Sequence, residues 1–335
     1  MKKRWQIPFL LFLIVATVWI IRRNAPHNAP FQRSEGAIFG TLWHATYQCD
    51  SSLTASIIQE LWKVDGSMSM FNPKSTLSRI NKNESDECDS LLSVVLTQAL
   101  QISKATNGCF DITVAPLVNA WGFGFKNSNL PDSTKVDSLL KLVGFEKLTL
   151  EGGRLTKADP DMVLDLSAIA KGFGVDQVAH LFNRLGIQNY MIEIGGEIVV
   201  HGHNPNGKAW SIGVNKPDED DTSTNHEIQE ILSLTDCALA TSGNYRNFYI
   251  DDNGKKVAHT IDPHTGYPVQ HTILSSTVLA PTCAMADAFA TSFMVMGLDS
   301  AKVILEQQPQ LKAYFIYSDE KGEYKTWRSP SFPKE

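Results

Sequence analysis

The sequence places a carboxylate and a hydroxyl one helical turn apart among small and apolar residues, in Ala284-Met-Ala-Asp287-Ala-Phe-Ala-Thr291. Residues four apart in a helix project from the same face, so Asp287 and Thr291 can meet one ligand. Oxygen ligands suit a hard cation such as Mg²⁺, which usually takes one or two carboxylates together with phosphate oxygens. Asp287 could instead cap the helix or pair with a surface lysine, but its small neighbours favour a metal site.

A second segment, Asp165-Leu-Ser-Ala-Ile-Ala-Lys171-Gly-Phe-Gly174, follows an apolar stretch and leads into an expected helix. The start of a helix offers free backbone N–H groups and a positive dipole end, which suit a phosphate group. Lys171 adds a positive charge there. The segment matches neither the P-loop nor G-x-G-x-x-G, and a helix capped by Asp165 or Ser167 explains it equally well.

A histidine precedes a segment rich in turn residues, His259-Thr-Ile-Asp-Pro-His-Thr-Gly-Tyr-Pro268. The Asp-Pro and Thr-Gly dipeptides indicate a loop. A histidine beside such a loop can act as a general base near neutral pH. On these residues alone, a structural histidine that bonds to backbone is the better interpretation.

The elements that must position these residues mix helix and strand patterns without a strict βαβ order. This mixture favours an α+β fold over a doubly wound sheet, with mixed sheets and packed helices in one large composite domain over residues 36–335. The paired glycines at 195–196 indicate a hairpin turn or, less commonly, a close approach to a ligand. Residues 217–227 form an acidic stretch that we interpret as a solvated loop. We expect helices over 53–64, 91–106, 133–142, 168–185 and 285–296, and strands over 37–47, 147–150, 154–156, 190–194, 197–201, 210–214, 230–234, 247–250, 276–279 and 313–317.

The composition is that of a globular protein. Of 335 residues, 43% are hydrophobic, and the net charge of −6 argues against a nucleic-acid-binding protein, which usually has a basic face. The five cysteines are widely spaced without a C-x-x-C pair, so they indicate neither a zinc framework nor a dense disulfide scaffold.

The first residues, 1–23, read MKKRWQIPFLLFLIVATVWIIRR, an apolar run bracketed by basic residues. No A-x-A-like cleavage site follows, so a signal anchor or an uncleaved signal segment is the best interpretation. Residues 24–35 look like a polar linker. The basic cluster before the apolar run favours a cytoplasmic N-terminus, with the folded domain on the periplasmic side of a bacterial inner membrane.

A longer block, Cys109-Phe-Asp-Ile-Thr-Val-Ala-Pro-Leu-Val-Asn-Ala-Trp-Gly-Phe-Gly124, resembles the G-x-F-D-x-T-x-x-P-L-x-x-x-W-x-F-G block of the ApbE family. These flavin transferases move FMN from FAD to a protein. The resemblance covers about the whole chain after the N-terminal segment. The other blocks, in family order, lie at 68–81, 165–174, 194–197, 241–245, 259–268 and 285–291.

The resemblance implies an enzyme that binds FAD with Mg²⁺ and links FMN to a Thr or Ser hydroxyl of a target flavoprotein, with release of AMP. The implied metal ligands are Asp287, Thr291 and the carbonyl of Ala168, and the implied base is His259. Phe39 stands where many members carry Met, and Lys171 where others carry Glu. The positions that match FAD contacts are Phe39, Met70, Phe71, Asn72, Asp111, Lys171 and Ile261.

Two other functions would use the same site. Water in place of the protein hydroxyl would make the chain an FAD pyrophosphatase that yields FMN and AMP. A membrane-tethered FAD-binding protein without catalysis is the alternative from another class, but it would have no need of His259 as a base.

Overall fold

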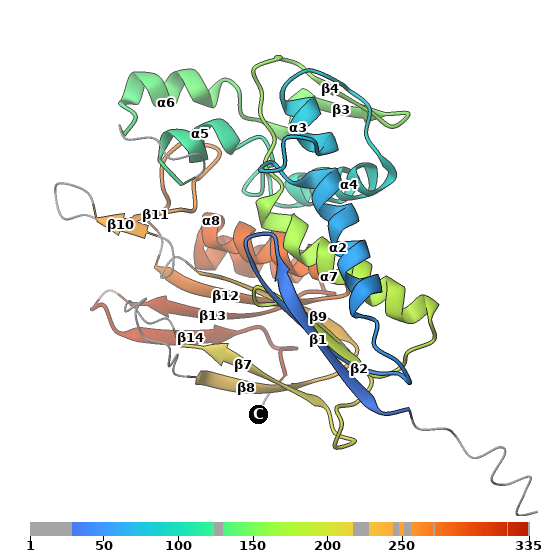
Figure 1. The fold of residues 1–335 in the computed structure, drawn as a ribbon. Helices are drawn as coiled ribbons and strands as arrows, with labels where there is room; N and C mark the ends of the chain where they lie inside the picture. Colours follow the sequence, from blue (N-terminus) through green and yellow to red (C-terminus); the bar gives the residue numbers. More distant parts are fainter. Residues whose placement is uncertain are drawn as a thin grey trace, which may run out of the picture.

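An eight-stranded sheet crosses the molecule in the order β1-β2-β5-β6-β9-β12-β13-β14 (Figure 1). The computed structural model describes residues 29–123, 130–216, 228–243, 248–250, 256–270, 272–319 and 321–333. The strands are β1 Phe31–Ile38, β2 Thr41–Gln48, β3 Leu148–Glu151, β4 Arg154–Lys157, β5 Tyr190–Ile194, β6 Glu197–His201, β7 Trp210–Asn215, β8 Ile228–Leu234, β9 Cys237–Gly243, β10 Phe248–Ile250, β11 Lys256–Ala258, β12 Ile273–Ala280, β13 Lys312–Ser318 and β14 Tyr324–Arg328.

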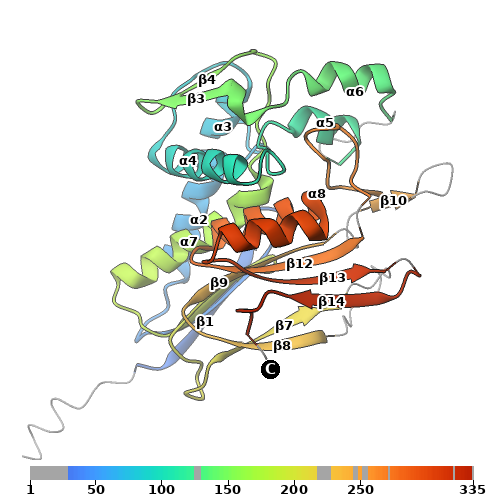
Figure 2. The same cartoon turned by 180° about the vertical axis from the view of Figure 1, so that it is seen from behind.

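Helices cover one face of this sheet, and a two-stranded hairpin covers the other. The long helices α7 and α8 pack against each other, and α8 lies on β9 and β12. The β7–β8 hairpin packs on the opposite face through Trp210, Ile212 and Leu232 (Figure 2). The helices are α2 Thr54–Met68, α3 Thr76–Asn81, α4 Ser90–Ala105, α5 Ala115–Ala120, α6 Ser133–Leu140, α7 Ser167–Arg184 and α8 Cys283–Gln307, with a 3₁₀ turn at Phe145–Lys147.

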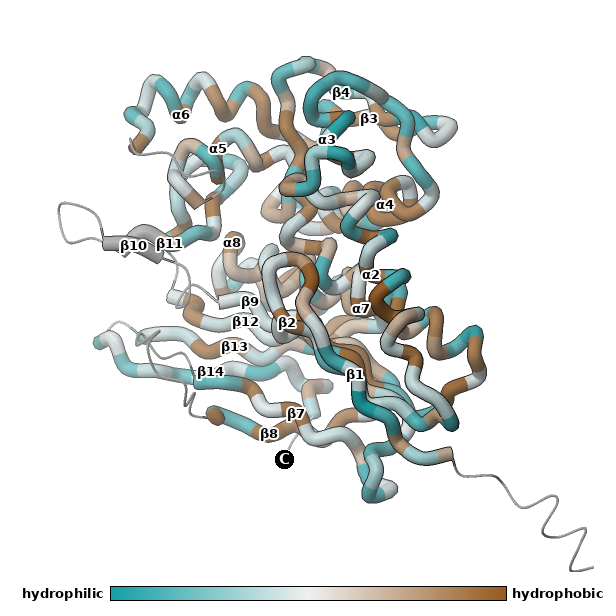
Figure 3. The backbone as a smooth tube through the Cα atoms, in the orientation of Figure 1, coloured by the Kyte–Doolittle hydropathy of each residue, from teal (hydrophilic) through white to brown (hydrophobic). Residues whose placement is uncertain are grey.

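A smaller region stands beyond α7 and α8 (Figure 1), and only its α5–α6 part has an apolar cluster separate from the main core. It holds α3 to α6 and the β3–β4 hairpin, and the loop after β11 packs onto it through Ile261 against Leu117 and Val136 (Figure 2). Figure 3 shows hydrophobic stretches along α4 and hydrophilic ones along the outer strands β1 and β14. The α+β expectation is confirmed, but every described strand pair is antiparallel, so the expected mixed sheets are wrong. Tight turns join β1 to β2 and β5 to β6, and each of these turns reverses the chain, which makes both pairs antiparallel.

The first strand differs from the expectation. A single strand was expected over 37–47, whereas the chain forms two strands that pair from Phe31↔Gln48 to Ile38↔Thr41. The turn between them holds Phe39 and Gly40 at φ of 52° and 74°, which the apolar pattern did not indicate. β1 also begins at Phe31, five residues before the expected domain boundary at 36.

The helix that carries Asp287 is interrupted. Regular helical backbone ends before Gly297, whose φ of 79° and ψ of 170° break α8 where the expected helix over 285–296 ends. In the described part of the chain, α8 is the one helix long and apolar enough to cross a membrane, but 61% of its most apolar stretch is buried in the protein, as in a core helix. The expected anchor over 1–23 and the acidic loop over 217–227 lie outside the described residues.

Candidate active site

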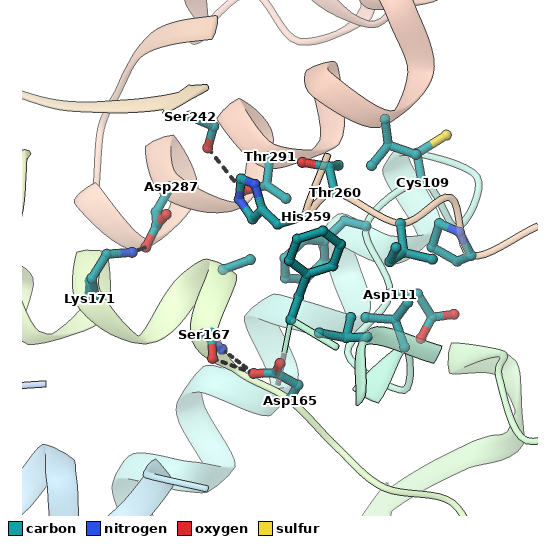
Figure 4. Close-up of a pocket in the computed structure, with 18 of the residues that line it drawn as sticks. Cys109, Asp111, Asp165, Ser167, Lys171, Ser242, His259, Thr260, Asp287 and Thr291 are labelled. Atoms are coloured by element: carbon teal, nitrogen blue, oxygen red, sulfur yellow. Dashed lines mark hydrogen bonds and ion pairs between the residues drawn. The ribbon is translucent and has the colours of Figure 1, made fainter. Parts of the chain in front are cut away.

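A cavity of about 440 Å³ lies between α7, α8, the end of β9 and the loop after β11 (Figure 4). Figure 4 shows the imidazole of His259 projecting into it, with Asp287 and Lys171 on its other side. Most of the site residues expected from the sequence line this one cavity: Met70, Phe71, Asp111, Ala168, Lys171, His259, Ile261, Asp287 and Thr291.

A neighbouring cavity of about 620 Å³ contains Phe39 and shares Met70, Phe71 and Lys171 with the first. The two spaces therefore have a common wall. Asn72 lines neither cavity. Its amide donates to Asp65 Oδ2 at 2.8 Å, which holds the turn after α2 in place.

The site depends on a close approach of α7 and α8. A Cβ on Gly172 would lie 2.6 Å from the carbonyl carbon of Cys283 and 2.8 Å from the nitrogen of Ala284, so a side chain there would collide with α8 backbone. Asp176, one turn further along α7, accepts the N–H groups of Cys283 and Ala284 at 2.8 and 2.9 Å. These two bonds satisfy N–H groups that have no partner within the first turn of α8. The start of α8 is thereby fixed on α7.

Asp176 carries a perturbed pKa because of this position. Burial raises the pKa of Asp176 to about 6, although the two amide donors from α8 favour its charged form. Asp287 nearby also raises it.

The residues expected to hold a cation, Ala168, Asp287 and Thr291, line the same cavity. Asp287 is 3% exposed, and its Oδ2 accepts the N–H of Gly172 at 3.1 Å. A regular helix directs that same N–H at the carbonyl four residues earlier, which is Ala168. The carboxylate and the carbonyl therefore lie close together. The Thr291 hydroxyl, one turn beyond Asp287, bonds the Ser242 hydroxyl at 3.0 Å.

This donor set fits Mg²⁺, because a carboxylate, a hydroxyl and a backbone carbonyl are all hard oxygen ligands. Within the described residues, no group of three His, Cys, Asp or Glu side chains is placed to hold a metal ion. One carboxylate is enough for Mg²⁺ when waters and substrate phosphates complete its ligands.

A second carboxylate, which ends the 194–197 block and for which the sequence indicated no role, also lines the cavity. Glu197, the first residue of β6, is 4% exposed, and its Oε1 lies 3.1 Å from the ammonium of Lys171. That ammonium lies 3.8 Å from Asp287 Oδ2. The signal in the sequence was an acid directly after the paired glycines, at a turn between two apolar strands.

These three charges perturb one another's pKa values. Burial opposes the charge of Lys171, but the carboxylates of Asp287 and Glu197 outweigh it and raise the pKa of Lys171 above its ordinary value. Burial raises the pKa of both carboxylates, and the Lys171 ammonium limits each shift. The raised pKa keeps Lys171 charged near neutral pH, and its single ammonium opposes the protonation of both carboxylates.

The loop over residues 259–268, which begins with His259, is held on both sides. The indole N–H of Trp121 donates to the carbonyl of Gly266 at 2.8 Å, and the His264 ring lies 2.8 Å from the carbonyl oxygen of Asn107. The His259 and Phe123 rings pack in a T-shaped arrangement with 6.3 Å between their centroids. The loop therefore presents His259 from a fixed frame.

Comparison with known proteins places the chain in a family. Residues 39–315 match the ApbE family. The chain belongs to the ApbE family. Curated relatives named FAD:protein FMN transferase include one from Haemophilus influenzae, 40% identical with 89% of this chain and 90% of the relative covered. Another, from Escherichia coli K12, is 33% identical over 89% of this chain and 87% of its own length.

Solved structures of ApbE proteins share the fold. The flavin transferase ApbE from Vibrio cholerae superposes with a TM-score of 0.81 at 36% identity, and covers 90% of this chain and 99% of its own. The apo form of the Pseudomonas stutzeri flavinyl transferase ApbE gives 0.80 at 26% identity, with 91% and 96% covered. The resemblance expected from the sequence is therefore confirmed, and so is the single large α+β domain.

Two positions that match the ApbE motifs also support the frame around the cavity. Both carboxylate oxygens of Asp111 accept hydrogen bonds, Oδ1 from Thr113 at 2.6 and 2.8 Å and Oδ2 from the Phe145 N–H at 2.8 Å. Asp165 Oδ1 accepts the Ser167 N–H at 2.7 Å, just before α7 begins. The N-cap of α7 is Leu166 and has no side-chain cap bond, so the expectation that Asp165 or Ser167 caps this helix is wrong; Asp165 instead closes the turn just before the helix.

Proposed function

We propose that this chain transfers FMN from FAD to a Thr or Ser hydroxyl of a target flavoprotein, with release of AMP and with Mg²⁺ at Asp287, Thr291 and the Ala168 carbonyl. The enzyme class follows from the family, whose curated relatives are named FAD:protein FMN transferases. The observation that carries the proposal is the meeting of these oxygens, the Lys171 ammonium and His259 in one cavity.

The two adjoining cavities suit a dinucleotide with a ring system at each end. The Asp287–Lys171 region supports a pyrophosphate subsite, since the start of α7 and the ammonium both favour negative charge. Met70 and Phe71 lie on the common wall, and Phe39 lines the far space, so apolar side chains are available to ring systems. In this proposal Asp111 and Ile261 line the FAD site from the opposite wall.

The proposed reaction joins the acceptor oxygen to the FMN phosphorus and breaks the bond from that phosphorus to the oxygen of the AMP phosphate. The acceptor hydroxyl proton goes to a ring nitrogen of His259. When bound, Mg²⁺ would neutralise charge on the pyrophosphate. The tasks of the chain itself are to hold the pyrophosphate beside Lys171, to orient the acceptor and to take its proton.

The test incubates the domain with FAD, Mg²⁺ and an acceptor peptide, and weighs the peptide. A gain of the FMN mass supports the proposal. Release of free FMN and AMP without labelled peptide would mean that the chain is an FAD pyrophosphatase, and unchanged FAD that it only binds FAD.

The role of His259 has its own test. His259→Asn should lower the transfer rate by roughly 10²–10⁴-fold, the usual share of general acid–base catalysis, with little change in FAD affinity. The wild-type rate should rise with pH through the imidazole pKa, about 6.5 for an unperturbed histidine. Loss of FAD binding in the variant, with an unchanged pH profile of its residual activity, would show that His259 only orders the loop.

We also propose that residues 1–23 anchor the chain in a bacterial inner membrane and that the domain faces the periplasm. The support is the apolar run between basic residues. Protease added to intact spheroplasts should then digest the domain. Digestion that requires rupture of the inner membrane would contradict this orientation.

A further inference from the structure

We propose that Glu197 is a positioning residue that sets the divalent-cation affinity of the Asp287 site, because it holds the Lys171 ammonium away from Asp287. The inference rests on the proposed role of Asp287 as a metal ligand. It adds a residue to which neither the family resemblance nor the relatives' names give a role.

Two carboxylates share the one ammonium of Lys171. Lys171 Nζ lies 3.1 Å from Glu197 Oε1 but 3.8 Å from Asp287 Oδ2. The nearer contact is a hydrogen-bonded ion pair, and the longer one is an ion pair beyond hydrogen-bond distance. In this structure the ammonium therefore belongs mainly to Glu197, and Asp287 remains open to another cation.

The carboxylates of Asp287 and Glu197 are fixed in place, whereas the Lys171 ammonium can move. Asp287 is fixed by the Gly172 N–H and by the contact of α8 with α7. Glu197 stands in β6, whose backbone pairs with β5 on one side and β9 on the other. Lys171 carries its charge on a flexible four-carbon stem. A change in the balance between the carboxylates would therefore move the ammonium rather than the backbone.

The buried carboxylate of Glu197 holds the Lys171 ammonium strongly. Glu197 Oε2 is buried and has no hydrogen-bond partner among the described residues. The charge of Glu197 is thus compensated chiefly by Lys171, and a buried charge without compensation is costly. Glu197 therefore keeps the ammonium, unless its own charge is removed.

The Lys171 ammonium and an entering divalent cation therefore compete for the Asp287 carboxylate. Without the charge of Glu197, the ammonium would pair with Asp287, and an entering divalent cation would have to displace it. Without Lys171, nothing would compete for Asp287, and Glu197 would have no route by which to influence the cation. Glu197 should therefore matter only when Lys171 is present.

The experiment measures binding of Mn²⁺ alone, without FAD, by calorimetry and by the electron paramagnetic resonance signal of free Mn²⁺. The chains compared are the wild type, Glu197→Gln, Lys171→Gln, the double variant and Asp287→Asn. We expect Glu197→Gln to weaken binding by about 10-fold, the scale on which one nearby charge shifts carboxylate protonation. Lys171→Gln should strengthen binding, and the double variant should equal Lys171→Gln.

A direct field of Glu197 on the cation gives a different result. In that case Glu197→Gln would weaken Mn²⁺ binding equally with and without Lys171, and the double variant would fall back toward wild type. That outcome overturns the inference. Should Glu197→Gln fail to fold, the comparison of the double variant with Lys171→Gln still decides. Glu197→Asp, which retracts the carboxylate by one methylene, should give an intermediate affinity.

Asp287→Asn separates this inference from the proposed function. If Asp287→Asn binds Mn²⁺ like the wild type, the metal assignment fails and the inference fails with it. If Asp287→Asn abolishes binding but Glu197→Gln has no effect, the metal assignment stands and the inference alone is wrong.

Discussion

The contact at Gly172 makes a sharp prediction, since one methyl group there should separate the two helices that form the site. In Gly172→Ala the new Cβ would collide first with the Cys283 carbonyl oxygen and would lie 2.6 Å from the carbonyl carbon, and the three atoms that oppose it most closely are all α8 backbone. Backbone cannot rotate aside as a side chain can. α8 must therefore move by about 1 Å to restore van der Waals contact at roughly 3.5–4 Å.

In Gly172→Ala, two effects lower the free energy of unfolding and one raises it. Overpacking of a core contact costs about 1–3 kcal/mol. The shift also weakens the bond from the Gly172 N–H to the Asp287 carboxylate, and a hydrogen bond to a charged group contributes about 1.5–3 kcal/mol. Alanine is the better helix former by about 1 kcal/mol. We therefore expect a net loss of about 2–5 kcal/mol in the free energy of unfolding.

Gly66→Ala is the matched control. Gly66 also lies in a helix, α2, but a Cβ there would meet nothing within 4 Å. The same substitution should stabilise the chain by about 0.5–1 kcal/mol. Urea denaturation followed by circular dichroism measures both variants, and Mn²⁺ binding reports the displacement of Asp287. If Gly172→Ala is as stable as Gly66→Ala and binds Mn²⁺ like the wild type, the close approach of α7 and α8 does not hold the site.

Three further predictions concern groups around the cavity. The raised pKa of Asp176, about 6 in the folded chain, means that this carboxyl stabilises the fold most below pH 4 and that the contribution is lost as pH rises toward 6. Relative to Asp176→Asn, the wild type should therefore lose about 3 kcal/mol between pH 4 and 7 in urea denaturation, and a constant difference would contradict the shift. Trp121→Phe removes the donor to Gly266 and should cost about 1 kcal/mol, with faster amide exchange over 259–268; unchanged exchange would show that the loop is held elsewhere. Burial, with a smaller effect of Asp262, raises the pKa of the Cys109 thiol to about 11. Iodoacetamide at pH 8 should alkylate it about 100-fold more slowly in folded than in unfolded chain, as read by peptide mass, whereas equal rates would mean an exposed thiolate.

The sequence predicted the parts of the site that depend on local spacing. The pair Asp287 and Thr291 could be read from the helical period, because both lie on one helix within one turn. The helices α4 and α7 were expected within one or two residues of their observed bounds, since caps and apolar periodicity are also local signals.

The parts that failed depend on contacts between distant segments. Spacing alone could not show that Glu197 faces Lys171, or that Asp176 caps α8, because those pairs arise from strand pairing and helix packing. The turn at Phe39 and Gly40 was missed for another reason. Phe39 holds a positive φ, which is rare for a bulky residue, so the apolar pattern ran through it as if it were strand.

The sequence distance across the α7–α8 contact also bears on how the protein is made. The bonds from Asp176 to Cys283 and Ala284 join residues 107 and 108 positions apart, and the bond from Gly172 to Asp287 spans 115. Contacts of such long range form late, because the entropy of closing a large loop must be overcome first. A nascent chain that ends before α8 lacks Asp287 and Thr291 altogether. Assembly of this centre therefore belongs to the last stage of maturation, after nearly the whole polypeptide has been synthesised, and a ribosome that stalls earlier leaves a product without it.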